Sequence, residues 1–304
     1  MKVHTFSNTQ RTYFTDHLPK SITVCDTPED ADVLIRGKMD KEEAHDGLKA
    51  VIIPFTGHNG MPVKTLRQKG VALFNTQAHS HFVSEKALTL TLALLGNVPS
   101  YHNNLKGGHW SGRNLPTRTR WVSLWNKHVG IYGYGKIGRH LKTLLDAFNV
   151  TVHVLDRGKD YPGCVVEKDL YALTGNTDLT IIAAPLTKDT QHAFSGPILD
   201  QLKGKYLVNV GRGRIIDEAA LYERLENGLI EGFASDVWFQ YPKDDETLAP
   251  SRYPIHTLEN VVLSPHTGGF TTEAQTLMLE ALVKRLRMIE AGDFSEALNL
   301  SDLE

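Results

Sequence analysis

The most informative stretch of the sequence is HVGIYGYGKIGRHLKTLLDAF, which spans residues 128–148. Its first residues form a short apolar run that predicts a strand, and Gly133, Gly135 and Gly138 follow in the spacing GxGxxG. Apolar side chains then recur at every third or fourth position, as in a helix with one face on a sheet. The first glycine permits a tight turn, the second lets a pyrophosphate approach, and the third lets helix and strand pack closely. The stretch therefore predicts a dinucleotide-binding turn.

An acidic residue supports this interpretation. Asp156 ends the next predicted strand, close to the spacing of about 20 residues expected for an acid that binds the adenosine ribose. A carboxylate there accepts hydrogen bonds from the ribose hydroxyls and repels a 2′-phosphate, which favours NAD. Arg157 has the charge to hold a 2′-phosphate, so NADP stays open as a secondary cofactor. The alternative is a glycine-rich turn without a ligand. It does not explain why a strand, a helix and an acid all stand at the expected positions around the glycines.

The surrounding sequence alternates between strand and helix patterns. From Val129 onward, the predicted strands are HVGIY, TVHVLD, LTIIAAP, YLVNVG, IEGFASDV and NVVLSPH. The first part repeats the alternation with MKVHTF, ADVLIRG, LKAVIIPF and VALFNT, and with PVKTLRQKG as one intervening helix. Such alternation predicts parallel sheets covered by helices. Residues 97–127 are poor in periodicity.

A long helical pattern from Thr272 to Ala291 is expected to pack back on the first unit, which makes that domain discontinuous. We therefore expect an α/β fold with two Rossmann-like or flavodoxin-like domains. The first comprises residues 1–97 plus 272–304, and the inserted nucleotide-binding domain comprises residues 98–271.

Composition excludes several classes of function. The 33 Lys and Arg against 35 Asp and Glu leave a formal charge of −2, so no basic footprint for nucleic acid or membrane stands out. Cys25 and Cys164 lie far apart without CxxC spacing, which argues against a disulfide scaffold or a metal site. The N-terminus turns polar within seven residues, and the apolar run 87–95 is shorter than the roughly 18 residues that span a bilayer. A reducing cytoplasm is the expected compartment.

Two polar residues follow predicted strands at positions that packing does not explain. Arg212 comes directly after YLVNVG, and His266 follows Pro265 in VVLSPHTGG. Either residue alone is more often structural than catalytic. Hydride transfer to a ketone, however, needs a cation to hold the carboxylate and polarise the carbonyl, and an acid with a pKa near neutrality to protonate the alkoxide. Behind a dinucleotide fingerprint, the two residues are interpreted as this pair.

The sequence as a whole resembles the D-2-hydroxyacid dehydrogenase family. Six ordered motifs carry the resemblance: NTQAHSHFVSEKALTLTLAL, VGIYGYGKIG, APLTKDTQH, LVNVGRGRIIDEAAL, GFASDV and SPHTGG. It implies hydride transfer between NAD(H) and a small 2-oxo or D-2-hydroxy acid, with the first domain as the substrate domain. Arg212 is then the substrate-binding arginine and His266 the acid/base. The backbone of Thr56, Gly57 and His58 receives the substrate carboxylate.

The resemblance also implies a cofactor site and an assembly. The expected cofactor-binding residues are Gly133, Gly135, Lys136, Ile137, Gly138, Asp156, Arg157, Pro185, Thr190, Val210, Gly211, Asp236, His266 and Gly268. Asp236 matches a family acid near the nicotinamide. The family usually pairs through the nucleotide domain, so a homodimer is expected, with the segment of Trp110, Trp121 and Trp125 as an arm. The alternative is that these tryptophans only cover the domain's own core.

The chain departs from the family pattern near the expected histidine. The family continues DV-x-x-x-EP, with a glutamate bonded to the catalytic histidine, whereas this chain reads DVWFQYP and places Tyr241 there. Asp244, Asp245 and Glu246 are candidate replacements, although a charge run in a loop is usually solvated. In the substrate loop, GHNGMP stands where a GVDNID-like string is common, and Ser80 replaces a common asparagine.

Two alternative functions remain. One is an NAD-binding regulatory protein of the same fold, in which Tyr241 marks weakened catalysis. The other is formate oxidation, which Ser80 disfavours because formate-oxidising relatives resemble one another in having asparagine at that position. Among substrates, hydroxypyruvate, glyoxylate, pyruvate and branched 2-oxo acids all stay open.

Overall fold

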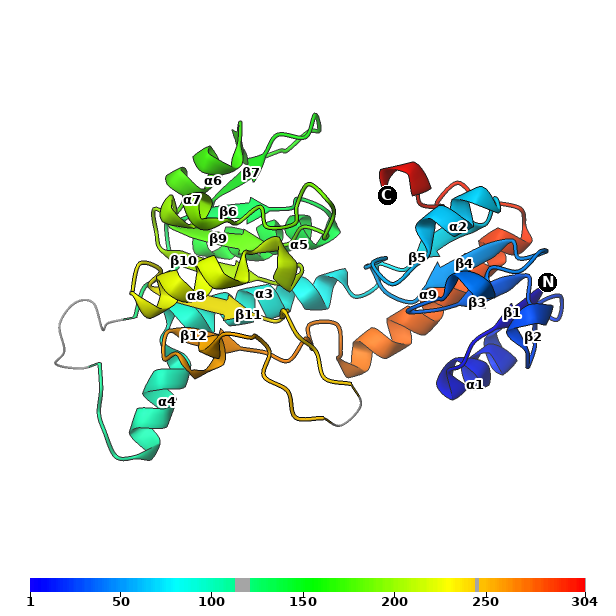
Figure 1. Cartoon of the computed structure of the whole chain (residues 1–304), viewed down its shortest axis with the longest axis horizontal. Coiled ribbons are helices and arrows are strands. Elements are labelled where there is room, and N and C mark those ends of the chain that lie inside the picture. Colours follow the sequence, from blue (N-terminus) through cyan, green and yellow to red (C-terminus); the bar gives the residue numbers. More distant parts are fainter. Residues whose placement is uncertain (113–120, 244–245, 304) are drawn as a thin grey trace. The chain divides into compact units, whose positions relative to one another are not determined.

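The computed structural model describes residues 1–112, 121–243 and 246–303 and divides into two compact units (Figure 1). Unit 1 comprises Met1–Ser80 with Phe270–Glu304, and unit 2 comprises His81–Gly269. Each unit holds one sheet of parallel strands. The expected α/β class is confirmed, as is the insertion of the nucleotide-binding domain into a discontinuous one.

Unit 1 is built on a five-stranded sheet with the order β2-β1-β3-β4-β5. Its strands are β1 Lys2–His4, β2 Thr23–Val24, β3 Val33–Ile35, β4 Ala50–Ile53 and β5 Ala72–Asn75. Its α-helices are α1 Asn8–His17, α2 Val63–Gln68 and α9 Thr272–Glu290. This order is the flavodoxin-like arrangement, in which ligands bind beyond the carboxyl ends of the strands.

Helix α9 joins the two parts of unit 1, and Figure 1 shows it beside the unit's strands. The helix begins where Thr271 accepts a hydrogen bond from the backbone of Ala274 at 3.1 Å. Leu282, Val283, Leu286 and Ile289 pack with residues of β1, β3, β4 and β5 in one core. Burying each of these side chains contributes roughly 1.5–3 kcal/mol, which explains why a distant segment closes the first domain.

Unit 2 is built on a seven-stranded sheet with the order β12-β11-β10-β9-β6-β7-β8. Its strands are β6 His128–Tyr132, β7 Thr151–Leu155, β8 Val165–Glu167, β9 Leu179–Ile182, β10 Tyr206–Asn209, β11 Gly232–Ser235 and β12 Val261–Leu263. Its α-helices are α3 Ser80–Leu95, α4 Val98–Lys106, α5 Lys136–Leu145, α6 Leu170–Asn176, α7 Gly196–Asp200 and α8 Glu218–Glu226. The strand order reverses between β6 and β9, where Rossmann folds bind nucleotides.

The division between the units falls at Ser80, whereas the sequence predicts a boundary after residue 97. Helix α3 belongs with unit 2 because its residues Ala87, Leu90 and Leu94 pack in one core with β6, β7 and α5. The segment 97–127, which lacks periodicity in the sequence, begins with α4, whose first turn contains Pro99. Residues 113–120 of this segment lie outside the described part.

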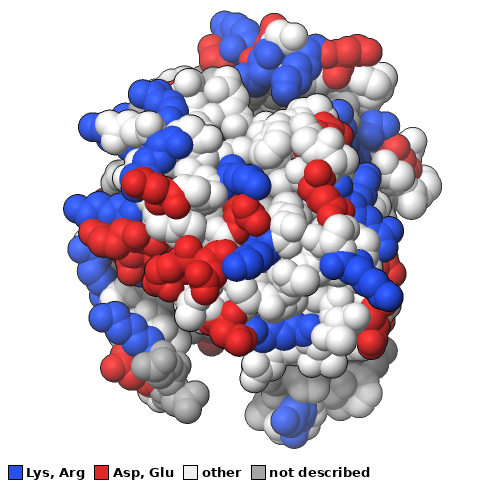
Figure 2. All heavy atoms as spheres, turned by 90° about the vertical axis from the view of Figure 1, so that its right-hand side faces the viewer, with Lys and Arg blue, Asp and Glu red and all other residues white. Residues whose placement is uncertain are grey.

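On the face drawn in Figure 2, basic and acidic side chains are interspersed, with uncharged surface between them. Within the described ranges, no helix combines the length and apolar character needed to cross a membrane.

Candidate active site

The glycine turn between β6 and α5 has the geometry that the spacing predicts. Gly133 adopts φ +106°, and a Cβ there would lie 2.5 Å from the backbone nitrogen of Ala184. A Cβ on Gly138 would lie 2.5 Å from the carbonyl oxygen of Gly133, so the helix packs directly on the turn. Gly135, at the start of α5, has open space where its Cβ would be. The turn therefore fits a pyrophosphate against the helix N-terminus.

Asp156 and Arg157 follow β7 and are both exposed. Asp156 Oδ1 accepts a hydrogen bond from the backbone of Gly158 at 2.8 Å, and the backbone of Arg157 donates to the Tyr161 hydroxyl at 2.8 Å. The carboxylate is thus held at the end of the strand, where a ribose is expected. Burial raises the pKa of Tyr132, and the nearby Arg157 opposes that shift. The guanidinium therefore lies toward the end of β6.

The remaining cofactor candidates of the sequence gather at the ends of β9 and β10. Thr190 Oγ1 donates to the carbonyl of Pro185 at 2.7 Å and closes that loop. The backbone of Val210 donates to the last residue of β9, and a Cβ on Gly211 would lie 2.6 Å from the Ala184 carbonyl oxygen. Lys136 and Ile137 occupy the first turn of α5. These segments meet around the glycine turn.

Arg212 follows β10 and is half-buried. Its Nη1 donates to the carbonyl of Gly211 at 2.7 Å. Asn209 fixes this turn, because its amide nitrogen donates to the Arg212 carbonyl at 3.1 Å and its amide oxygen accepts from the Gly211 backbone at 3.0 Å. Burial lowers the pKa of Arg212, and the nearby Tyr241 opposes the shift. Within the described ranges no carboxylate forms an ion pair with this guanidinium, which leaves it available to an anion.

His266 follows β12 in a turn that Asp236 holds together. The Asp236 carboxylate, which is 3% exposed, accepts from the Ser264 hydroxyl at 2.5 Å and from the backbone of Thr267 at 2.9 Å and Gly268 at 2.8 Å. His266 itself adopts φ +58°, a left-handed conformation that costs a non-glycine residue about 1–3 kcal/mol. The buried carboxylate therefore stabilises a strained turn that presents the imidazole.

The half-buried imidazole has an unusual electrostatic environment. Burial and the nearby Arg212 guanidinium lower the pKa of His266, and Asp236 opposes the shift. The ring of Tyr241 lies 5.5 Å from the imidazole, centroid to centroid, while its hydroxyl accepts from the backbone of Trp238 at 2.9 Å. Tyr241 is thus placed beside His266 without supplying a negative charge.

Of the candidate replacement acids, Glu246 is exposed, and its backbone donates to the Lys243 carbonyl at 3.3 Å rather than to His266. Asp244 and Asp245 lie outside the described residues. The residues that sequence reasoning missed are the supports, Asn209 and Ser264. Their signal is a buried polar residue next to, or at the end of, an otherwise apolar strand.

The loop of Thr56, Gly57 and His58 follows β4 in unit 1. The side-chain amide of Asn75 donates to the Thr56 carbonyl at 2.8 Å, and the backbone of Met61 donates to the His58 carbonyl at 3.0 Å. These bonds hold the loop at the carboxyl end of β4. Arg212, His266 and Tyr241 lie in unit 2.

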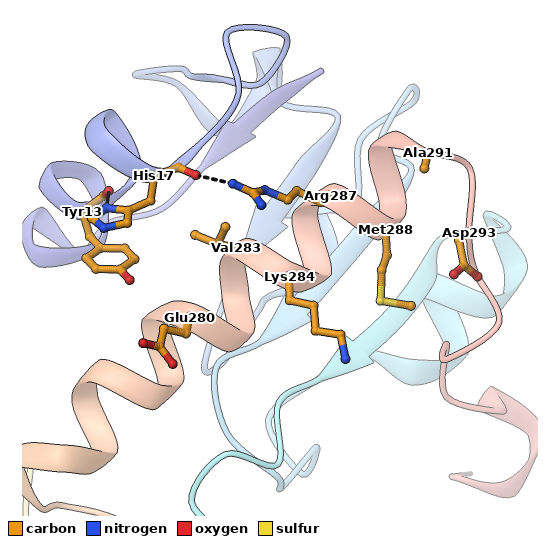
Figure 3. A pocket seen from close by; sticks show the side chains of 9 residues that line it. All are labelled: Tyr13, His17, Glu280, Val283, Lys284, Arg287, Met288, Ala291 and Asp293. Carbon is orange, nitrogen blue, oxygen red and sulfur yellow. Dashed lines mark hydrogen bonds between the residues drawn. The ribbon is translucent and has the colours of Figure 1, made fainter.

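A separate groove of 690 Å³ lies between α1 and α9 (Figure 3). Its rim includes the stacked rings of Tyr13 and His17, 3.8 Å apart, and Arg287, which donates to the His17 carbonyl at 3.0 Å. None of the predicted site residues lines it. The groove is therefore not the site that the sequence predicts.

Two further expectations concern assembly and metals. Trp110, Trp121 and Trp125 are 71%, 60% and 57% exposed, so they do not cover the core of their own unit. The dimer arm stays a prediction that light scattering of the purified protein can measure. Among the described residues no cluster of His, Cys, Asp or Glu is suited to a metal ion.

Comparison with known proteins identifies relatives of this chain. The model of the D-isomer specific 2-hydroxyacid dehydrogenase NAD binding domain matches residues 88–268. The hydroxypyruvate reductase of Thermotoga maritima is 31% identical over 89% of this chain and 88% of its own length. The D-3-phosphoglycerate dehydrogenase of Methanocaldococcus jannaschii is 29% identical over 88% of this chain, which spans only 51% of that protein.

Among solved structures, an acyclic imino acid reductase in complex with NADPH and D-Arg shares the fold. Its TM-score is 0.83 at 20% identity, over 98% of this chain and all of that one. The match to the NAD-binding domain and the extent of the similarity to the Thermotoga protein show that the chain belongs to the D-isomer specific 2-hydroxyacid dehydrogenase family of NAD(P)-dependent oxidoreductases.

Proposed function

We propose that this protein interconverts small 2-oxo acids and D-2-hydroxy acids with NAD(H), as the name of the Thermotoga relative suggests for hydroxypyruvate. The observation that carries the proposal is the half-buried Arg212, unpaired with any described carboxylate, beside an imidazole whose pKa it lowers. A protein that only senses NAD has no need of such a pair. The catalytic interpretation is therefore favoured over the regulatory one.

In this proposal the side chains of Arg212 and His266 act on the substrate together with the loop after β4. Bound NADH supplies the hydride to the carbonyl carbon of the substrate. Arg212 holds the substrate carboxylate through two parallel hydrogen bonds and polarises the carbonyl. His266 donates the proton that neutralises the developing alkoxide, and in the oxidative direction its neutral form accepts that proton. The amides of Thr56, Gly57 and His58 bind the substrate carboxylate.

The direct test is a screen for NADH oxidation with glyoxylate, hydroxypyruvate, pyruvate and 4-methyl-2-oxopentanoate. We expect turnover of at least one acid and a higher kcat/KM with NADH than with NADPH, because Asp156 repels a 2′-phosphate. Absence of turnover with every acid contradicts the proposed reaction. A preference for NADPH contradicts the role of Asp156 and points to Arg157.

Replacing Tyr241 with glutamate tests the proton donor. Reduction requires protonated His266, so activity falls as pH rises through its pKa, which burial and Arg212 lower. A carboxylate beside the imidazole favours the protonated form and raises its pKa by about 1–3 units. We expect the basic limb of the reductive kcat/KM profile to move to higher pH in Tyr241→Glu.

Tyr241→Gln is the matched control, because it carries no charge and should leave the limb in place. The measurement is kcat/KM against pH at saturating NADH for all three proteins. An unchanged limb in Tyr241→Glu argues that another acid already serves the imidazole.

A further inference from the structure

Two exposed aromatic rings stand at the carboxyl edge of the sheet in unit 1. Phe6 lies two residues beyond β1 and is 71% exposed, and Phe55 lies two residues beyond β4 and is 39% exposed. The segment of Arg36 and Gly37 follows β3, which lies between β1 and β4 in the sheet. Each ring leans on this segment, so the two rings flank the end of β3.

Arg36 is a support for Phe6 rather than a ligand-binding cation. It is 3% exposed, and its Nε donates to Glu43 at 2.7 Å while its Nη2 donates to His4 Nδ1 at 3.1 Å. Its Nη1 donates to the backbone of Ile35 at 3.0 Å. The face of the guanidinium covers the Phe6 ring, with Cζ 4.1 Å from the ring centroid. The charge is therefore satisfied within the protein, and the exposed ring is fixed in place.

Phe55 packs on a glycine. Its ring lies over Gly37, where a Cβ would be 3.0 Å from Phe55 Cε1, so only glycine leaves the ring its full space. Phe55 also directly precedes Thr56, in the loop that Asn75 and Thr76 hold through the carbonyls of Thr56 and Pro54. The ring is therefore positioned next to the amides that are proposed to receive the substrate carboxylate.

We propose that Phe55 and Phe6 receive the side chain of the substrate, and that the enzyme selects 2-oxo acids with an apolar side chain. This rests on the proposed function, because it takes the Thr56 loop as the place of the carboxylate. Aromatic carbon offers no hydrogen bond, so the hydroxymethyl group of hydroxypyruvate loses water there without replacement. Glyoxylate has no side chain to gain from the contact, whereas an isobutyl or benzyl group buries apolar surface.

The competing chemistry at this edge is a second carboxylate. Lys38 is exposed and directly follows Gly37, on which the Phe55 ring packs. A dicarboxylic substrate is thus a defined alternative, and 2-oxoglutarate represents it in the experiment.

The experiment measures kcat/KM for reduction of glyoxylate, hydroxypyruvate, 2-oxoglutarate, 4-methyl-2-oxopentanoate and phenylpyruvate by the wild-type protein. We expect kcat/KM for the better of the two apolar acids to exceed that for glyoxylate, hydroxypyruvate and 2-oxoglutarate by about tenfold or more. This is the discrimination that a few methylenes give in an apolar pocket. In Phe55→Ala, kcat/KM for the apolar acids should fall by about tenfold, mainly through KM, with glyoxylate changed less than about twofold.

Two further variants keep the test specific. Phe55→Leu retains apolar surface and should keep most of the preference. Leu277→Ala, on α9, removes a side chain that is 40% exposed, much like Phe55. It should leave kcat/KM for every substrate unchanged. Equal losses for glyoxylate and the apolar acids in Phe55→Ala would indicate a general disturbance of the loop and overturn the inference.

The outcomes separate this inference from the function on which it rests. If no acid is reduced, the proposed function fails. If kcat/KM for glyoxylate or hydroxypyruvate equals that for the apolar acids, the proposed function stands and the apolar selection is wrong. A preference for 2-oxoglutarate that is lost in Lys38→Met also overturns it and assigns the edge to a second carboxylate.

Discussion

Replacing His266 with asparagine should lower kcat/KM for 2-oxo acid reduction by roughly 10²–10⁴-fold, the contribution of a positioned acid/base. Asparagine suits the test because it tolerates the left-handed conformation, φ +58°, better than most residues. The turn that Asp236 holds should therefore survive, and the variant loses only the proton donor. The measurements are steady-state NADH oxidation and a fluorescence titration of NADH, whose Kd separates loss of the proton donor from loss of cofactor binding.

The chain offers a matched control for this substitution. His192 is exposed, lies in unit 2 and adopts φ +53°, so His192→Asn makes the same change in the same backbone conformation. We expect its kcat/KM to stay within about twofold of the wild type, as for most surface substitutions. If His266→Asn keeps more than about a tenth of the activity, another group supplies the proton.

Arg212→Ala should lose on the order of a hundredfold or more in kcat/KM, because a charge-assisted bidentate contact in a site shielded from water contributes several kcal/mol. NADH affinity should stay nearly intact, and Arg212→Lys should rescue only in part, since lysine lacks the planar fork. Removing the guanidinium also removes a charge that lowers the pKa of His266. The basic limb of the residual reductive activity should therefore move to higher pH.

Arg214→Ala is the control for loss of a positive charge, since Arg214 is exposed two residues further along the same turn. Its kcat/KM and pH profile should match the wild type. Near-normal turnover in Arg212→Ala contradicts the assignment of the substrate carboxylate. A large loss in both variants instead points to a general electrostatic effect.

Local patterns predict the elements of the fold well where side chains repeat at a fixed period. The run before Gly133 and the apolar stripe after Gly138 become β6 and α5, and the final helical pattern becomes α9. Helix α1 is not predicted from such a pattern, because Gln10 and Phe14 are its only buried residues. The assignment of α3 to unit 2 also depends on which core its leucines meet, and periodicity carries no such information.

The candidate site shows the same limit at the level of single residues. Arg212 and His266 can be identified from the sequence because each follows a predicted strand. The bonds that hold the turn of His266 join residues far apart in the chain, because the Asp236 carboxylate accepts from the backbone of Thr267 and Gly268. Whether Tyr241 bonds the imidazole or the backbone of Trp238 depends on how the chain bends after β11. A linear motif specifies the position of that residue and not its partner.

The return of α9 to unit 1 has a consequence for how the chain is made. The segment from β1 to β5 emerges from the ribosome early, but the helix that packs against these strands is complete only at residue 290. At about 5–20 residues per second, roughly 10–40 s pass between the emergence of residue 80 and that of residue 290. During this interval the intervening unit, whose elements are all contiguous, can fold first. The nascent first sheet meanwhile keeps an apolar face that is open to chaperones and to other nascent chains.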